Sequence, residues 1–184
     1  MSTVLALDLS ATKAGVAWPD GSVEVLEPPN AVGNKANRLH WWYATTRRRI
    51  AGLDRAPDVV VVESPAFSKS NNGTVSTAMV RGAVALACRH EIGEDRWVDI
   101  ASTSIKKYAL GRGAGKGTGK DEMKAACRKR LPWNGESEDE ADALWLWALT
   151  MHALGSPVVE VPQTHQDALP KVRQALARVC AVPA

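Results

Sequence analysis

The sequence is poor in cysteine, and it has no long apolar run. Only Cys88, Cys127 and Cys180 are present, and they form no C-x-x-C motif and no Cys/His spacing. This pattern argues against a disulfide framework or a structural zinc site and favours a reduced, cytoplasmic setting. No apolar stretch approaches the roughly 20 residues of a membrane helix. Nor does the N-terminus read as a signal peptide, so we expect no membrane partner.

Composition places the chain among ordinary globular proteins. Its 184 residues are 45% hydrophobic and 23% charged, which excludes a disordered or collagen-like chain. We expect one domain over residues 1–155 and a C-terminal tail over 156–184, with a short amphipathic stretch near 168–180. Seven tryptophans accompany a single phenylalanine. We expect most of them to fill the core or subunit contacts, where phenylalanine is more usual.

The net charge of +3 hides an uneven distribution along the chain. Residues 1–102 are neutral overall, residues 103–130 carry +7, and residues 131–184 carry −4. The two charged segments nearly cancel in the total. The sequence therefore predicts a cationic surface and an acidic surface rather than a uniformly charged molecule.

The hydrophobic pattern predicts an α/β fold. Three short alternating runs joined by polar turns indicate an antiparallel meander, and a valine run, PDVVVVE, indicates a strand buried on both faces. Helical periodicity, with Asn34 as the N-cap, follows the meander. The order βββαβαβααα implies a sheet with helices on both faces. The expected strands are 3–9, 13–19, 21–27, 57–63 and 96–101, and the expected helices are 35–53, 73–90, 103–109, 119–130 and 138–154.

Four carboxylates stand at informative positions. Asp8 and Glu63 each lie where an apolar strand gives way to a loop, the edge at which ligands bind in open α/β sheets. Asp139 and Asp142 lie three residues apart on an expected helix, so both point from one face. Each taken alone has an ordinary explanation as a turn former or as a helix N-terminal charge.

Convergence of these four groups would require compensation. Two like charges about 4 Å apart repel by about 4 kcal/mol at an effective dielectric constant of 20. Several such pairs would cost more free energy than the small net stability of a domain provides. Either some groups are protonated, or a divalent cation neutralises them. Oxygen ligands of this kind suit Mg²⁺, with Mn²⁺ as a substitute. Two such ions roughly 3.5–4 Å apart would activate a water and stabilise the leaving oxygen, so the sequence predicts two-metal phosphodiester hydrolysis.

Three motifs in order, LALDLS, VVVVESPAF and EADALWLWAL, resemble those of the RuvC-type Holliday junction resolvases of the RNase H-like superfamily. The resemblance spans residues 3 to 154. It implies a five-stranded mixed sheet of three antiparallel and then two parallel strands. It also implies Mg²⁺-dependent cleavage of branched DNA by a homodimer. The family's catalytic, metal-binding carboxylates correspond to Asp8, Glu63, Asp139 and Asp142.

The sequence departs from the family at two places. Asp-Leu-Ser stands where bacterial resolvases commonly have Asp-Pro-Gly, which suggests a divergent, phage-type branch. Family members carry an aromatic residue shortly after the glutamate, and here Phe67 lies four residues after Glu63, one later than expected. Phe67 either contacts bases at the branch point or folds back onto the core.

The basic segment contains a glycine-rich stretch, GRGAGKGTGK. It is not a P-loop, because the Gly-x-x-x-x-Gly-Lys-Ser/Thr register is missing and an expected helix precedes it. A charge run is often only a solvated face, but beside a phosphodiester-cleaving site it favours DNA. The resemblance matches Lys106 to one family lysine and either Lys120 or Lys116 to a second. The expected DNA-binding residues are Phe67, Lys69, Lys106, Lys107, Arg112, Lys116 and Lys120.

The expected function is therefore a Mg²⁺-dependent crossover junction endodeoxyribonuclease acting on four-way or other branched DNA. The helix expected near 73–90 is apolar around much of its circumference, so we expect it to contribute to a homodimer interface as well as to the core. Two alternatives stay open. One is another RNase H-like nuclease that cuts RNA–DNA hybrids, and the other is a branched-DNA-binding module without catalysis.

Overall fold

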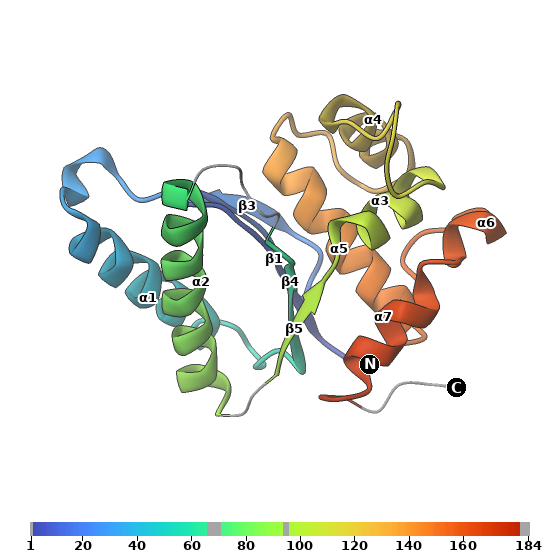
Figure 1. Ribbon diagram of the computed structural model, residues 1–184. Helices are drawn as coiled ribbons and strands as arrows, with labels where there is room; N and C mark the ends of the chain where they lie inside the picture. Colours follow the sequence, from blue (N-terminus) through green and yellow to red (C-terminus); the bar gives the residue numbers. More distant parts are fainter. Residues whose placement is uncertain (1, 66–70, 94–95, 181–184) are drawn as a thin grey trace.

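A five-stranded mixed sheet forms the centre of the molecule. The computed structural model describes residues 2–65, 71–93 and 96–180. The strand order is β3-β2-β1-β4-β5 (Figure 1). The first three strands pair antiparallel, whereas β1 with β4 and β4 with β5 pair parallel. This is the fold class that the sequence predicts. The strands are β1 Val4–Leu9, β2 Ala14–Ala17, β3 Val23–Leu26, β4 Val59–Glu63 and β5 Trp97–Ile100.

Helices cover both faces of the sheet (Figure 1). Helices α1 (Lys35–Ala51) and α2 (Asn71–Ile92) lie on one face. On the other face, α5 (Glu138–Ala153) lies against the strands, with α3 (Ser102–Leu110) and α4 (Lys120–Arg130) beside it. A 3-10 turn, Asn30–Val32, precedes α1. The expected N-cap is confirmed, because the Asn34 side chain accepts a hydrogen bond from the Asn37 backbone N–H at 3.0 Å.

Strand alternation divides the core between the two layers. Even-numbered residues of β1 such as Val4 and Ala6 pack on the α5 side, and odd-numbered ones such as Leu5 and Leu7 pack toward α1 and α2. Helix α5 is buried along most of its length, which explains why its sequence is apolar on every side. Four tryptophans confirm the expected core role: Trp42, Trp133, Trp145 and Trp147 are buried.

The C-terminal tail packs against the same core. It contains two short helices, α6 (Gln163–Gln166) and α7 (Leu169–Leu176). Val172 and Leu176 of α7 are buried in the cluster on the α5 side. A hydrogen bond of 2.8 Å between His165 Nδ1 and the Tyr108 carbonyl oxygen ties α6 to α3. Among the helices of the described residues, none is long and apolar enough to span a membrane.

Candidate active site

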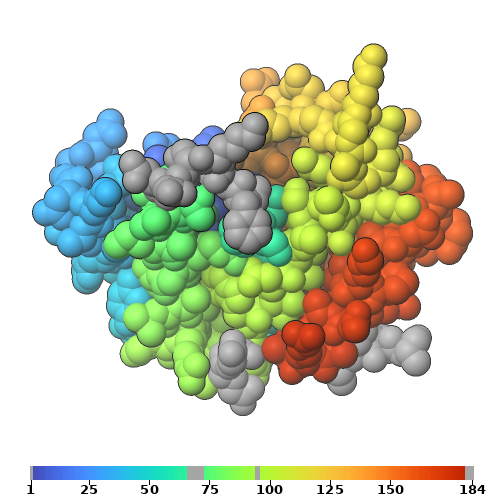
Figure 2. All heavy atoms as spheres, viewed as in Figure 1, coloured from blue at the N-terminus to red at the C-terminus, as the bar shows by residue number. Residues whose placement is uncertain are grey.

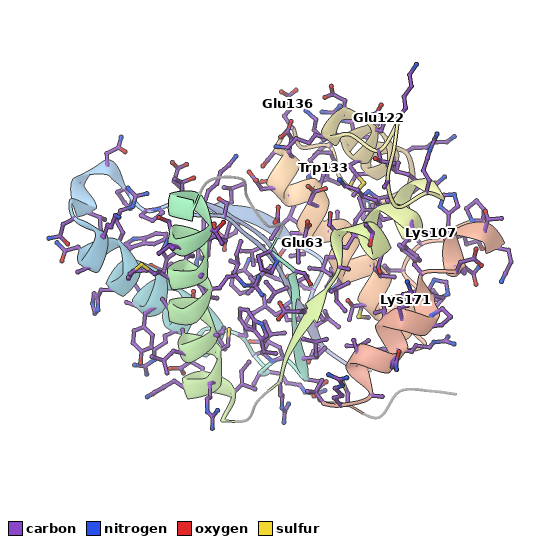
Figure 3. All side chains as sticks on the ribbon, in the orientation of Figure 1. Glu63, Lys107, Glu122, Trp133, Glu136 and Lys171 are labelled. Atoms are coloured by element: carbon purple, nitrogen blue, oxygen red, sulfur yellow. The ribbon has the colours of Figure 1, made fainter. Side chains whose placement is uncertain are left out.

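Two carboxylates lie at one edge of the sheet. Asp8 is the penultimate residue of β1, and Glu63 is the last residue of β4. Because β1 and β4 are parallel neighbours, their carboxyl ends share an edge. Ala6 and Val61, two residues before each carboxylate, both belong to the core on the α5 side. Alternation therefore points Asp8 and Glu63 toward α5 as well, and Figure 3 shows Glu63 between the sheet and that helix layer.

The other two carboxylates come from the first turns of α5. Ser137 caps this helix, and its hydroxyl accepts a hydrogen bond from the Glu140 backbone N–H at 3.4 Å. The cap fixes the start of the helix next to the strand edge, where α5 contacts β1 and β2. Asp139 and Asp142 therefore project from one helix face toward Asp8 and Glu63.

The electrostatics show that the four groups sense one another. Burial, followed by the charges of Glu63, Asp142 and Asp139, raises the pKa of Asp8 to about 8. Burial and the charge of Glu63 raise the pKa of Asp142 to about 7. Burial also raises the pKa of Glu63, partly opposed by a hydrogen bond from Ser102. The structure thus brings together all four carboxylates that the sequence singles out.

The donor set fits a hard divalent cation. All four groups are carboxylates, and burial together with repulsion from neighbouring carboxylates raises the pKa of Asp8 and of Asp142, a repulsion that such an ion would relieve. In the described ranges, no three Asp, Glu, His or Cys side chains are yet close enough together to bind one ion directly. Binding would therefore require the carboxylates to draw together.

Gly15 of β2 determines how closely α5 approaches the sheet. A Cβ atom at this position would lie 1.9 Å from the backbone oxygen of Asp139. No side chain fits in that space, so only glycine lets the first turn of α5 reach the strand edge. Sequence reasoning missed this role, because nothing in the sequence identifies the helix that packs against this strand.

Lys13 is a second residue of the site that the sequence reasoning missed. Its ammonium forms an ion pair with Asp139 Oδ2. Lys13 immediately precedes β2, two residues before Gly15, so an extension of the strand's alternation by one residue points both toward α5. This alternation is the sequence feature that could have identified Lys13 as part of the site. It is informative only when the position of α5 is known.

Two expected DNA-binding lysines lie beside the carboxylates. The positive charge of Lys106 in α3 partly offsets the rise in the pKa of Glu63. The charges of Lys106 and Lys120 partly offset the rise in the pKa of Asp142 in the same way. Lys120, the first residue of α4, also forms an ion pair of 2.5 Å with Glu138 Oε2. The sequence leaves open whether Lys116 or Lys120 corresponds to the second family lysine. In the structure, Lys120 is the one that lies next to the carboxylate cluster.

The remaining expected DNA contacts lie farther out. Arg112 and Lys116 are exposed in the glycine-rich loop, where the Arg112 guanidinium donates to the Lys116 carbonyl oxygen at 3.2 Å. This loop and α4, yellow in Figure 2, form the upper edge of the molecule in that view. Lys107 lies on the α6 side of α3 (Figure 3) and pairs with Asp167 at 3.2 Å. Phe67 and Lys69 lie outside the described residues.

Comparison with known proteins gives a structural match only. No protein-family model and no curated protein sequence matches the chain. The fold is similar to that of Thermus thermophilus RuvC in complex with a Holliday junction substrate, with a TM-score of 0.61 and 19% identity over 79% of this chain and 90% of that chain. A second structure of Thermus thermophilus RuvC matches with a TM-score of 0.60 and 19% identity, over 86% of this chain and 99% of that one. At this identity the likeness establishes a shared RNase H-like fold.

Proposed function

We propose that this chain is a divergent RuvC-type nuclease, a metal-dependent endonuclease that cleaves Holliday junctions or other branched DNA. One observation carries the proposal: four carboxylates, from β1, β4 and α5, lie at the carboxyl edge of the sheet, near enough that, besides burial, the charges of the other three raise the pKa of Asp8. The similarity of the fold to a RuvC that was solved with a Holliday junction substrate supports the substrate class.

Asp8, Glu63, Asp139 and Asp142 would hold the divalent cation, Mg²⁺ or in its place Mn²⁺. When bound, such a cation supplies an activated water and stabilises charge on the scissile phosphate. The chain's own contribution is to hold the carboxylates on rigid elements, two at strand ends and two on a capped helix. Burial of this edge strengthens each electrostatic interaction there.

The lysines beside the cluster would position the substrate. Lys106 and Lys120 place positive charge next to the carboxylates, where a phosphate would otherwise be repelled. Arg112 and Lys116 extend this charge along the exposed loop. Lys107 would contribute only if its ion pair with Asp167 opened. Phe67 and Lys69 stay proposed DNA contacts on the strength of the resemblance.

Helix α2 supplies the surface for the proposed homodimer. Its Val75, Met79 and Leu86 side chains are 57%, 44% and 60% exposed. They lie on one side of the helix, together with Gly82, where a Cβ would meet open space. The opposite side of α2 is buried, through Val80, Val84 and Cys88. A two-fold pair of α2 helices would cover this exposed apolar surface and place two active sites on one junction.

Light scattering on the purified protein tests the dimer. The wild type should have twice the mass of one chain, and Leu86→Glu should halve it. Val158→Glu is the control, because Val158 is also exposed, at 38%, but lies far from α2 in the chain. A monomeric wild type would remove the homodimer from the proposal without affecting the carboxylate site.

A cleavage panel tests the substrate class. The protein is incubated with a four-way junction, a replication fork, a flap, a linear duplex and an RNA–DNA hybrid, each with and without Mg²⁺. We expect Mg²⁺-dependent cutting of the branched substrates and little cutting of linear duplex. Preferential cutting of the hybrid would favour the other RNase H-like activity, and tight junction binding without cutting would favour a non-catalytic module.

A further inference from the structure

Strand β5 forms an open edge of the sheet. It is the outermost strand beside β4, with α2 over one face and α7 over the other (Figure 1). The Val60 backbone N–H donates to the Arg96 carbonyl oxygen at 2.9 Å, so Arg96 and every second residue after it pair with β4. In a parallel ladder the residues between them direct their backbone groups the other way. The N–H and C=O groups of Trp97 and Asp99 therefore point outward, away from β4.

These outward groups of β5 have no backbone partner. Within residues 2–65, 71–93 and 96–180, no strand pairs with this edge and no hydrogen bond involves the outward groups. Groups of this kind are a template on which an extended peptide adds as a strand. A short edge strand can equally be left to solvent, so the surroundings of β5 decide what the edge can bind.

The hollow on the α2 face of β5 is mostly apolar. Its volume is about 330 Å³, and its lining includes Trp97, Val60, Cys88 and Ile92. Val60 and Cys88 are buried core residues, so the hollow reaches down to the core and has room for an apolar side chain. Leu86 also lines this hollow and belongs to the surface proposed for the homodimer, so the test below uses no variant of it.

The hollow on the α7 face of β5 is basic. Its volume is about 400 Å³, and it lies between β5 and α7. Lys171 of α7 (Figure 3) and Arg178 line it, both exposed, and in the described part of the chain neither forms an ion pair. Asp99 does not neutralise them, because its carboxylate is paired with Arg81 of α2. This hollow therefore presents uncompensated positive charge.

We propose that the open edge of β5 binds an extended, acidic segment of a partner protein, which adds to the sheet as a further strand. Side chains of a strand alternate between its two faces. One set would enter the apolar hollow beside α2, and the other would meet Lys171 and Arg178. The edge therefore recognises apolar residues that alternate with aspartate or glutamate.

A nucleic acid fits this edge less well than a peptide does. The outward C=O groups of Trp97 and Asp99 would repel phosphates, and the hollow beside α2 offers a phosphate no donor set. Recognition of a peptide is a function beyond the proposed nuclease activity, and it does not depend on the carboxylate site.

Fluorescence anisotropy of labelled synthetic peptides tests the recognised pattern. The panel alternates valine, isoleucine or leucine with aspartate or glutamate. Each peptide has a control of the same composition in which apolar and acidic residues stand in adjacent pairs, and a control with lysine in place of the acid. At least one alternating peptide should bind wild-type protein saturably, and its two controls should bind about tenfold more weakly or not at all.

Backbone methylation of the best peptide tests strand addition. In an added strand, alternate N–H groups face β5 and the others face solvent. Methylating the nitrogens of the apolar residues gives one variant, and methylating those of the acidic residues gives another. One of the two should lose binding and the other should keep it. Equal effects of the two methylations would contradict strand addition, and this comparison uses wild-type protein throughout.

Charge reversal on the protein tests the basic hollow. Lys171→Glu combined with Arg178→Glu should weaken binding of the best peptide by about tenfold and leave junction cleavage unchanged. Lys35→Glu combined with Arg48→Glu is the matched control, because both residues are exposed on α1 and form no ion pair among the described residues. This control should bind the peptide as the wild type does. Circular dichroism checks that each variant folds.

The proposal would be overturned if no alternating peptide bound up to millimolar concentration, or if the peptides with paired residues bound equally well. It would also be overturned if folded Lys171→Glu with Arg178→Glu bound the peptide as the wild type does. Binding of a single-stranded oligonucleotide, lost in that variant while no peptide binds, would assign the edge to nucleic acid instead. None of these results would affect the carboxylate site, which junction cleavage tests separately.

Discussion

The carboxylate edge and the basic segment differ in how the fold holds them. The carboxylates stand on strand ends and on the first turns of a buried helix, where burial and repulsion from neighbouring carboxylates raise the pKa values of Asp8 and Asp142. Most of the basic segment lies on an exposed loop and on exposed helix faces. A catalytic site needs functional groups that are held in place and shielded from water. A surface that binds a polyanion such as DNA needs only accessible positive charge. Each prediction below disturbs one region while leaving the other intact.

The largest effect is expected from Gly15→Ala, which displaces α5 from the sheet. The added Cβ would lie 1.9 Å from a backbone atom, so the helix start must move. We expect the free energy of unfolding to fall by about 2 kcal/mol and cleavage to be lost, since Asp139 and Asp142 move together. Urea unfolding and a junction cleavage assay measure the two effects.

Gly52→Ala controls for the change of residue type. Gly52 ends α1 with a φ of −85°, and a Cβ there would lie 3.4 Å from the Arg48 backbone oxygen, an ordinary contact, so alanine should change stability by no more than about 1 kcal/mol and leave cleavage intact. If Gly15→Ala were as stable and as active as the wild type, the close packing of α5 against β2 would not be what positions the helix carboxylates.

The next effect concerns the basic segment. Lys106→Ala combined with Lys120→Ala should weaken junction binding and reduce the slope of log affinity against log salt by about 2 units, since each lost phosphate contact removes about 0.9. Lys171→Ala with Arg178→Ala, on and just after α7, removes the same charge elsewhere. An unchanged slope in the first pair would remove both lysines from the DNA interface.

In the absence of metal, stability should also depend on pH. The folded protein keeps Asp8 protonated up to about pH 8, whereas an unfolded aspartate ionises near pH 4. Between these values the folded state binds more protons, so the free energy of unfolding should fall as pH rises, by at most about 1.4 kcal/mol per pH unit for this group.

Asp8→Asn should flatten that dependence. Urea unfolding in EDTA at pH 5 and pH 8 compares it with the wild type. Asp54→Asn, at an exposed carboxylate, should keep the wild-type slope. Equal slopes in Asp8→Asn and the wild type would show that Asp8 titrates as it does in the unfolded chain.

The sequence predicts the sheet and the carboxylates for the same reason. Strand alternation and the valine run determine where β1 and β4 end, and both acidic residues stand at those ends. The periodicity of α5 places Asp139 and Asp142 on one face. These features depend on neighbours in the chain, so a pattern within one segment is enough to locate them.

Other features depend on contacts between distant segments. The ion pair of Lys13 and the close fit of Gly15 arise only when α5 packs on β2, a pairing no local pattern encodes. The basic segment predicts both Lys106 and Lys107 as DNA contacts, yet adjacent helix residues diverge, and Lys107 faces Asp167 in the tail. The position of α7 depends in the same way on the packing of its apolar face against the core.

The central claim is that the carboxylate edge cuts DNA and the basic segment binds it. The most direct measurement is cleavage and binding of one four-way junction by wild type and Asp8→Asn in Mg²⁺. We predict that the variant loses cutting and keeps junction affinity. Undiminished cutting by Asp8→Asn would contradict the account, and so would loss of binding together with cutting in a folded variant.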